Sequence, residues 1–330
     1  MSAFQALWIE KTDNGFTRNI ITRNTSDLPS GDLLIEVAYS SLNYKDAMSA
    51  TGAPGVTRNY PHTPGIDAAG IVLETTSSDF SIGDEVIVIG FDLGMDTPGG
   101  FGQRIRVPSD WAIKKPDDLT LKESMILGTA GFTAALAIKK LEDVAMSPEG
   151  GPVLVTGATG GVGSVAVRLL SHLNYEVHAV SGKPDQHGFL KDLGAAEIIS
   201  REDASANAER PIGRETWGGV IDTVGGDILV NGLKGLRYGQ SLASCGLVLS
   251  PSIKATVLPF ILRHVNLLGI DSVQLPIEQK RDIWQLLASS WKLDDLENLS
   301  TNLELKDVSE AVDRILQGQM VGRCVVNLRE

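Results

Sequence analysis

One short glycine-rich stretch constrains this chain more than any other, because of what precedes and follows it. Val153–Val155 is an apolar run of the kind that forms a buried parallel strand, and glycines follow at positions 157, 160 and 163. The apolar residues after the glycines recur with helical spacing, and a second strand is predicted over 176–181. We therefore predict a strand–turn–helix–strand unit. Its glycine turn would let backbone N–H groups at the helix start approach a pyrophosphate. The alternative is a glycine-rich turn without a ligand.

The end of the second strand indicates which dinucleotide the unit would bind. An NAD site usually carries Asp or Glu here, to hold the ribose 2′-hydroxyl. This strand ends instead in Ser181-Gly182-Lys183, and Arg201 follows a later apolar pair, Ile198-Ile199. A hydroxyl and two cations suit a 2′-phosphate, so the sequence favours NADPH. The alternative is that Lys183 and Arg201 are ordinary solvated charges.

Three later strands are predicted by apolar runs, and polar or glycine residues follow each of them. The runs cover 218–223, 241–245 and 265–270. In open α/β sheets, ligands bind outside the carboxyl ends of the strands. Gly225, Leu247 and Ser272 are therefore candidate cofactor contacts by position.

The pattern of predicted elements divides the chain into two domains. Residues 1–125 contain short β-prone runs separated by Gly, Pro, Asp and Asn, which indicates a compact irregular barrel. Helical patterns at 121–127 and 132–141 mark the transition, and strands and helices alternate from 153 onward. After helices near 277–287 and 305–316, a last strand at 323–328 plausibly returns to the first domain. We predict an α/β protein in which 1–125 and 273–330 form one domain and 126–272 form a Rossmann-type doubly wound domain.

Composition excludes several classes of partner. The 330-residue chain carries a formal net charge of −12 without basic clusters, which disfavours binding to nucleic acid or to an anionic membrane. No run approaches 18 uninterrupted apolar residues, and the N-terminus lacks a signal-peptide pattern. The two cysteines, Cys245 and Cys324, lie in apolar contexts without metal-ligand spacing. We expect a cytoplasmic protein with buried thiols.

Several motifs taken in order resemble the zinc-independent branch of the medium-chain dehydrogenase/reductase superfamily, and within it the YhdH/YhfP family of quinone-oxidoreductase-like proteins. The motifs are Ser40–Asp46, Pro64–Asp67, Ile126–Ala134, Thr156–Gly163, Ile221–Gly225 and Gly269–Val273. The resemblance implies a GroES-like barrel plus a Rossmann domain, with the active site in the cleft between them. It implies a homodimer formed through the strand at 265–270. The NADPH contacts that it implies are Tyr44, Thr159, Gly160, Gly161, Val162, Ser181, Gly182, Lys183, Arg201, Leu247 and Ser272.

The sequence departs from the zinc-dependent branch of that superfamily. Those relatives carry a Cys where this chain has Ser41-Leu42-Asn43, a His-Glu pair near Pro64–Asp67, and four closely spaced cysteines. Nitrogen and sulfur ligands for zinc cannot be assembled here. His62 is close in sequence but stands without partners, as structural histidines usually do. We expect no metal.

The resemblance implies an NADPH-dependent acrylyl-CoA reductase, which reduces the activated C=C bond to give propanoyl-CoA without a metal. Asn43 and Tyr44 are the candidate catalytic groups, because the enolate formed on the thioester needs hydrogen-bond donors and then a proton. The alternative role of Tyr44 is to bind the cofactor. Two other functions stay open: a quinone or enone reductase on the same scaffold, and an NADPH-binding protein without turnover.

Other polar residues near these motifs have less specific expectations. We expect Asp67 to fix the Pro64-Gly65 turn, and Asp46 to pair with Lys45 or with the barrel. Guanidinium groups bind phosphate with two parallel hydrogen bonds, which makes arginines candidates for the phosphates of coenzyme A. Those candidates are Arg58, Arg263 and Arg323.

Overall fold

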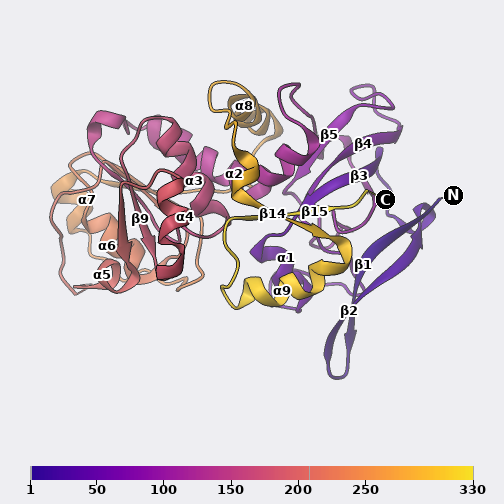
Figure 1. Ribbon diagram of the computed structural model, residues 1–330, viewed down its shortest axis with the longest axis horizontal. Helices are drawn as coiled ribbons and strands as arrows, with labels where there is room; N and C mark the ends of the chain where they lie inside the picture. Colours follow the sequence, from indigo (N-terminus) through magenta and orange to yellow (C-terminus); the bar gives the residue numbers. More distant parts are fainter. Residues whose placement is uncertain (1, 208, 330) are drawn as a thin grey trace. The chain divides into compact units, whose positions relative to one another are not determined.

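The computed structural model describes residues 2–207 and 209–329, which form two compact units. The first unit comprises 1–129 and 273–330, and the second comprises 130–272. The division falls within helix α2 (Leu121–Glu142), which continues past it with a break in helical geometry at Gly128. The sequence predicted two helices here, and the structure joins them through that glycine. Figure 1 labels the helices and strands of both units.

The first unit is built on a mixed seven-stranded sheet in which segments distant in sequence are neighbours. The order is β14-β15-β3-β4-β5-β7, and β6 also pairs with β3. The strands are β3 (Leu33–Ser41), β4 (Asp67–Thr75), β5 (Glu85–Ile89), β6 (Arg104–Val107), β7 (Ala112–Lys114), β14 (Ser300–Glu304) and β15 (Arg323–Asn327). A separate hairpin is formed by β1 (Ala3–Thr12) and β2 (Gly15–Asn24). The predicted return of the last strand is confirmed, because β15 lies between β14 and β3.

Two helices of the first unit, α1 (Tyr44–Ala50) and α9 (Val308–Leu316), contribute to one apolar core. A further helix of this unit, α8 (Ile277–Ala288), buries Ile283, Trp284 and Leu287. Helix α9 lies beside α1 (Figure 1) and buries Val308 and Val312 in the same core as Ile35 and Phe101. The strands β2, β7 and β14 were not predicted, because their exposed or very short runs carry little apolar alternation.

The second unit is a doubly wound sheet of six parallel strands in the order β10-β9-β8-β11-β12-β13. The strands are β8 (Val153–Val155), β9 (Val177–Ser181), β10 (Glu197–Ser200), β11 (Gly219–Asp222), β12 (Ser241–Ser244) and β13 (Asn266–Gly269). The helices are α3 (Gly161–His172), α4 (His187–Asp192), α5 (Arg201–Ser205), α6 (Gly226–Lys234) and α7 (Leu258–Arg263). The strand order reverses between β8 and β11, and such a switch point opens a crevice at the carboxyl ends of the strands.

Helix α2 is the one described helix whose length and apolar composition would suit a membrane span. However, 72% of that stretch is buried inside the protein. Its residues Phe132, Ala135 and Ile138 are fully buried, as expected for a core helix.

Candidate functional site

The glycine turn between β8 and α3 has the geometry that a bound pyrophosphate needs. Gly157 has φ +59°, a left-handed conformation that favours glycine. A Cβ on Gly163 would lie 2.3 Å from the Gly157 carbonyl oxygen, so only glycine lets the helix approach the turn. A Cβ on Gly160 would lie 3.3 Å from the same carbonyl oxygen, which is closer than an ordinary van der Waals contact. The turn is therefore tight, and it leads into the first turn of α3, where a helix start presents N–H groups to an anion.

A buried carboxyl group fixes this turn to its neighbour across the switch point. Asp222 ends β11, and its Oδ1 accepts a hydrogen bond from Thr156 Oγ1 at 2.7 Å. Its Oδ2 accepts from the backbone N–H of Gly225 at 2.8 Å. Thr223 completes the connection, since its hydroxyl donates to the Thr156 carbonyl oxygen at 2.8 Å. Burial raises the pKa of Asp222. The predicted candidate Gly225 thus serves in this clamp.

Two cations meet at the ends of β9 and β10. Ser181 is buried at the end of β9, and its Oγ accepts a hydrogen bond from the Lys183 backbone N–H at 3.0 Å. A Cβ on Gly182 would lie 3.1 Å from Arg201 Nε, so this guanidinium lies against the glycine backbone. Burial, and then the charge of Arg201, lowers the pKa of Lys183. A dianionic phosphate placed here would relieve the repulsion between the two cations.

The remaining predicted contacts of the second unit lie at the ends of β12 and β13. A cavity of about 460 Å³ is lined by residues 244–247 and 269–271. Leu247 lines it and is 59% exposed. Ser272 follows directly and is buried, and its Oγ accepts a hydrogen bond from Thr133. Thr159, at the glycine turn, is buried as well.

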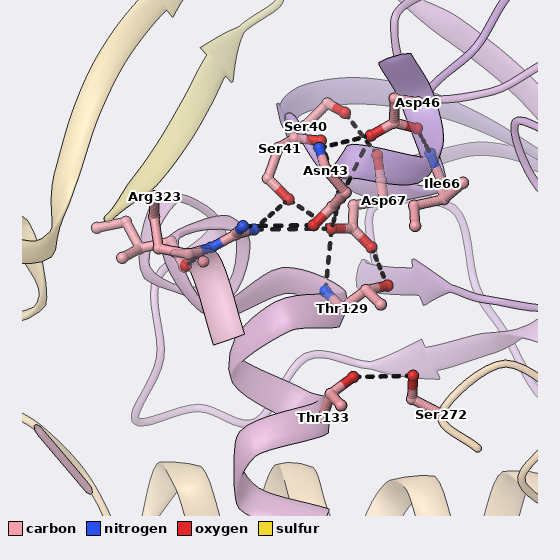
Figure 2. A network of polar contacts seen from close by, with 12 residues as sticks. Ser40, Ser41, Asn43, Asp46, Ile66, Asp67, Thr129, Thr133, Ser272 and Arg323 are labelled. Carbon is pink, nitrogen blue, oxygen red and sulfur yellow. Dashed lines mark hydrogen bonds and ion pairs between the residues drawn. The ribbon is translucent and has the colours of Figure 1, made fainter. Parts of the chain in front are cut away.

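The predicted catalytic pair of the first unit adjoins a buried polar network centred on Asp67 (Figure 2). Asp67 Oδ2 accepts hydrogen bonds from Ser41 Oγ, from Asn43 Nδ2 at 2.8 Å and from the Thr129 backbone N–H at 2.9 Å. Its Oδ1 accepts from Thr129 Oγ1 at 2.5 Å. The fully buried Asp67 side chain is thus the acceptor in all four of these hydrogen bonds.

Arg323, from β15, supplies the positive charge of this network. Its Nε donates to the Ile126 carbonyl oxygen at 2.9 Å, Nη2 to Ser41 Oγ at 2.9 Å, and Nη1 to Asn43 Oδ1 at 3.3 Å. Its Nη2 lies 4.0 Å from Asp67 Oδ2. Burial lowers the pKa of Arg323, and the charge of Asp67 opposes that effect.

Gly128 permits the close approach of α2 to the network. Its φ is +50°, and a Cβ there would lie 2.5 Å from both Asp67 Oδ2 and Ser41 Oγ. The Thr129 N–H follows this break, where a helix start needs a capping partner, and the Asp67 carboxylate accepts its hydrogen bond. The kink and the cap therefore depend on each other.

A second buried carboxyl group shapes the start of α1. Asp46 Oδ2 accepts from the Asn43 backbone N–H at 2.8 Å, and Oδ1 accepts from the Ile66 N–H at 2.7 Å. Burial and the negative charge of Asp67 raise the pKa of Asp46 to about 7. Asn43 is the N-cap of α1 and is buried, whereas Tyr44 begins the helix and is 40% exposed. Asn43 thus points into the network, and Tyr44 offers its ring to the surface of its unit.

One of the two expectations about individual carboxylates is wrong. Asp67 bonds Ser41, Asn43 and Thr129 rather than the Pro64-Gly65 turn. For Asp46 the second of the two expected alternatives is confirmed, because it pairs within the barrel domain: it accepts hydrogen bonds from the backbone N–H groups of Asn43 and Ile66 rather than pairing with Lys45.

Two of the three arginines considered for coenzyme A are committed elsewhere. Arg323 is buried in the network, and Arg263 donates to the Lys234 and Gly213 carbonyl oxygens. Arg58 is 80% exposed beside Asp96.

The network and the Asp222 clamp were missed because their members are distant in sequence. One local signal was present: Asn43 and Asp46 have the spacing of an N-cap and the third helical residue, which is a helix-start signature.

Within 2–207 and 209–329, no group of three or more His, Cys, Asp or Glu side chains is arranged to hold a metal ion. His62 Nε2 donates a hydrogen bond to the Gly94 carbonyl oxygen at 2.9 Å, and burial lowers the pKa of His62.

Comparison with protein families matches both units. An alcohol dehydrogenase GroES-like domain matches residues 29–117, and a zinc-binding dehydrogenase model matches residues 161–289. The predicted fold class, a Rossmann-type doubly wound sheet plus a GroES-like domain, is confirmed.

Individual relatives resemble nearly the whole chain. YhfP of Bacillus subtilis, named as a quinone oxidoreductase, is 43% identical over 98% of this chain and 99% of its own. Its structure with NAD bound has a TM-score of 0.97 and covers 99% of this chain and 100% of that one. Acrylyl-CoA reductase AcuI of Ruegeria pomeroyi is 42% identical over 98% and 99% of the two chains. The yhdH oxidoreductase of Salmonella enterica, solved with NADP, is 41% identical with a TM-score of 0.96, covering 98% and 100%. The chain therefore belongs to the YhdH/YhfP family of acrylyl-CoA reductases and quinone-oxidoreductase-like proteins, within the medium-chain dehydrogenase/reductase superfamily.

Proposed function

We propose that this protein is an NADPH-dependent reductase of acrylyl-CoA. The observation that carries the cofactor is the meeting of Lys183 and Arg201 beside Ser181, where an NAD site usually places an acid. The substrate rests on the likeness to AcuI, 42% identical along nearly the full chain. The same fold and turn serve YhfP, so a quinone or other enone is the competing substrate.

The second unit holds the dinucleotide in this proposal. Thr159 and Gly160 of the glycine turn, with Gly161 and Val162 at the start of α3, bind the pyrophosphate through their N–H groups. Ser181, Gly182, Lys183 and Arg201 bind the 2′-phosphate ribose. Leu247 and Ser272 contact the other nucleotide half. When bound, NADPH supplies the hydride that, with a proton from the protein or water, converts acrylyl-CoA to propanoyl-CoA.

The first unit supplies polar groups in this proposal. Tyr44 is the exposed residue of the candidate pair and contacts the cofactor or donates the proton. The Asn43 amide is already bonded to Asp67 and Arg323, so we assign it the role of holding Tyr44 at the helix start. Arg58, the one exposed arginine of the three considered, is the candidate for a coenzyme A phosphate.

The test measures oxidation of the reduced cofactor from the loss of its absorbance. Acrylyl-CoA, crotonyl-CoA and a small quinone are assayed in parallel. Each substrate is assayed with NADPH and again with NADH. Turnover of acrylyl-CoA with NADPH alone supports the proposal. Turnover of the quinone with inert thioesters would replace it by the quinone reductase. Binding of NADPH without turnover of any substrate in a wider enone panel would favour a non-catalytic cofactor-binding protein.

We also propose that the protein is a cytoplasmic homodimer that pairs through β13. Within the described residues this strand pairs only with β12, which leaves a sheet edge. Beside it, Val257, Ile261 and Leu262 are 66%, 69% and 59% exposed, and apolar surface next to an open edge favours association. Sedimentation equilibrium tests this. Ile261→Asp is expected to give monomers, and a monomeric wild-type protein would contradict the proposal.

A further inference from the structure

Two buried hydroxyl groups meet in the second unit, one on a helix and one after a strand. Thr133, on α2, is 5% exposed, and Ser272, which follows β13, is 8% exposed. Thr133 Oγ1 donates a hydrogen bond to Ser272 Oγ at 2.8 Å (Figure 2). The bond joins residues 139 positions apart in the chain.

The direction of this bond determines what Ser272 can still do. A serine hydroxyl carries one donor and two acceptor lone pairs. Because Thr133 is the donor, the bond uses a lone pair of Ser272 and not its proton. The bond also fixes the Oγ atom in place, so the directions left for the Ser272 O–H are restricted to those that point away from Thr133.

The position of Ser272 in the sheet indicates which ligand group lies near it. A dinucleotide bound at a switch point extends across the carboxyl ends of the strands on both sides of it. The cation pair at Lys183 and Arg201 takes the 2′-phosphate half at β9 and β10, and the glycine turn after β8 takes the pyrophosphate. The nicotinamide half therefore lies toward β12 and β13, where residues 244–247 and 269–271 line a cavity of about 460 Å³. Ser272 directly follows that lining.

The nicotinamide ring offers one strong hydrogen-bonding group, its carboxamide, whose carbonyl oxygen accepts and whose amide donates. We propose that Thr133 is a positioning residue, which holds Ser272 so that the Ser272 O–H donates to the carboxamide oxygen of the nicotinamide. The inference rests on the proposed NADPH function. Thr133 acts through Ser272 and orients the reactive ring without touching the adenosine half of the cofactor.

A purely structural bond between α2 and the end of β13 would behave differently. Its loss would lower the stability of the unit and affect every ligand of the unit alike. A positioning role instead discriminates between ligands with and without the nicotinamide ring. That difference in selectivity, and not activity, is the decisive quantity.

The experiment measures dissociation constants of the full-length protein by calorimetry for NADPH and for 2′-phospho-ADP-ribose, which lacks the nicotinamide. Thr133→Val keeps the side-chain volume and removes the donor. We expect it to weaken NADPH binding about fivefold to tenfold, as for one buried hydrogen bond, and to leave 2′-phospho-ADP-ribose unchanged. Thr133→Ser restores the hydroxyl and is expected to bind NADPH as the wild type does. Ser272→Ala is expected to show the same selective loss, with no further loss in the double variant.

Ser241→Ala is the matched control. Its hydroxyl is also buried and accepts a side-chain hydrogen bond, from Asn266 Nδ2 at 3.1 Å, but it lies at the start of β12, at the opposite end of the sheet. We expect unchanged affinity for both ligands. Equal losses for both ligands in Thr133→Val, or no loss in Thr133→Val and Ser272→Ala, would overturn the inference while leaving the cofactor proposal standing. If the wild-type protein binds neither 2′-phospho-ADP-ribose nor NADPH, both this inference and the cofactor proposal are overturned.

Discussion

Replacing Asp67 by Asn removes one charge from the centre of the buried network and leaves its shape almost unchanged. The carboxylate now receives donors from Ser41, Asn43 and both the backbone and side chain of Thr129. An amide offers one acceptor oxygen, and its NH₂ group would face donors. The buried guanidinium of Arg323, 2% exposed, would lose its nearest ionised partner.

The expected cost follows from these contacts. Removing one partner of a buried ion pair costs about 3–5 kcal/mol, because the remaining charge stays buried. Domains are typically stable by only about 5–15 kcal/mol. With a urea dependence of about 2 kcal/mol per molar, the unfolding midpoint of the first unit should fall by roughly 2 M. The second unit, which contains none of these residues, should keep its midpoint.

Tryptophan fluorescence separates the two units. Of the 5 tryptophans, only Trp217 lies in the second unit, so a Trp217→Phe background reports on the first unit alone. Asp313→Asn is the control, because Asp313 pairs with Arg18 while its own side chain is 50% exposed, and such pairs contribute about 1 kcal/mol or less. If Asp67→Asn lowers the free energy of unfolding no more than Asp313→Asn does, the network is not a main source of stability and the reasoning fails.

Two further predictions concern charges. Burial and the charge of Asp67 raise the pKa of Asp46 from 3.8 to about 7. The folded state thus holds that proton more tightly than the unfolded state, and this contribution to stability is complete below pH ~4 and lost as pH rises to ~7. Asp46→Asn should flatten this part of the pH profile of unfolding in urea, and an unchanged slope would refute the assignment. Lys183→Ala should raise the KM for NADPH about tenfold or more with little change for NADH, since a charged hydrogen bond is worth about 1.5–3 kcal/mol. Steady-state kinetics with both cofactors decide it, and equal effects on both would count against a 2′-phosphate contact.

Sequence reasoning could predict the local structure of the candidate cofactor half because its signals are local. The glycine turn, the strand before it and the helix after it lie within one continuous stretch, and the spacing of glycines reflects contacts between near neighbours. The end of β9 is equally local: Ser181 and Lys183 are two residues apart, and their hydrogen bond is within the turn. Such features depend on backbone geometry that a few consecutive residues impose.

The buried network could not be derived in this way. Asp67, Thr129 and Arg323 come from β4, α2 and β15, and only the completed sheet brings them together. Charged side chains are rarely fully buried unless they are paired. The sequence of each segment alone therefore predicts an exposed charge or a turn residue at these positions. The sequence does not show which partner is present, so Arg323 was wrongly considered for phosphate binding.

The position of β15 in the first unit has a consequence for the order of folding during synthesis. The second unit is one continuous segment and can form its sheet once residue 272 has left the ribosome. The first unit cannot complete its sheet until residues 323–327 are made, because they pair with β3 and supply the guanidinium that faces Asp67. Contacts between such distant segments form slowly. During synthesis, therefore, the second unit can be folded while the sheet of the first unit is still incomplete. Truncation after residue 322 should leave the second unit folded and the first unable to fold.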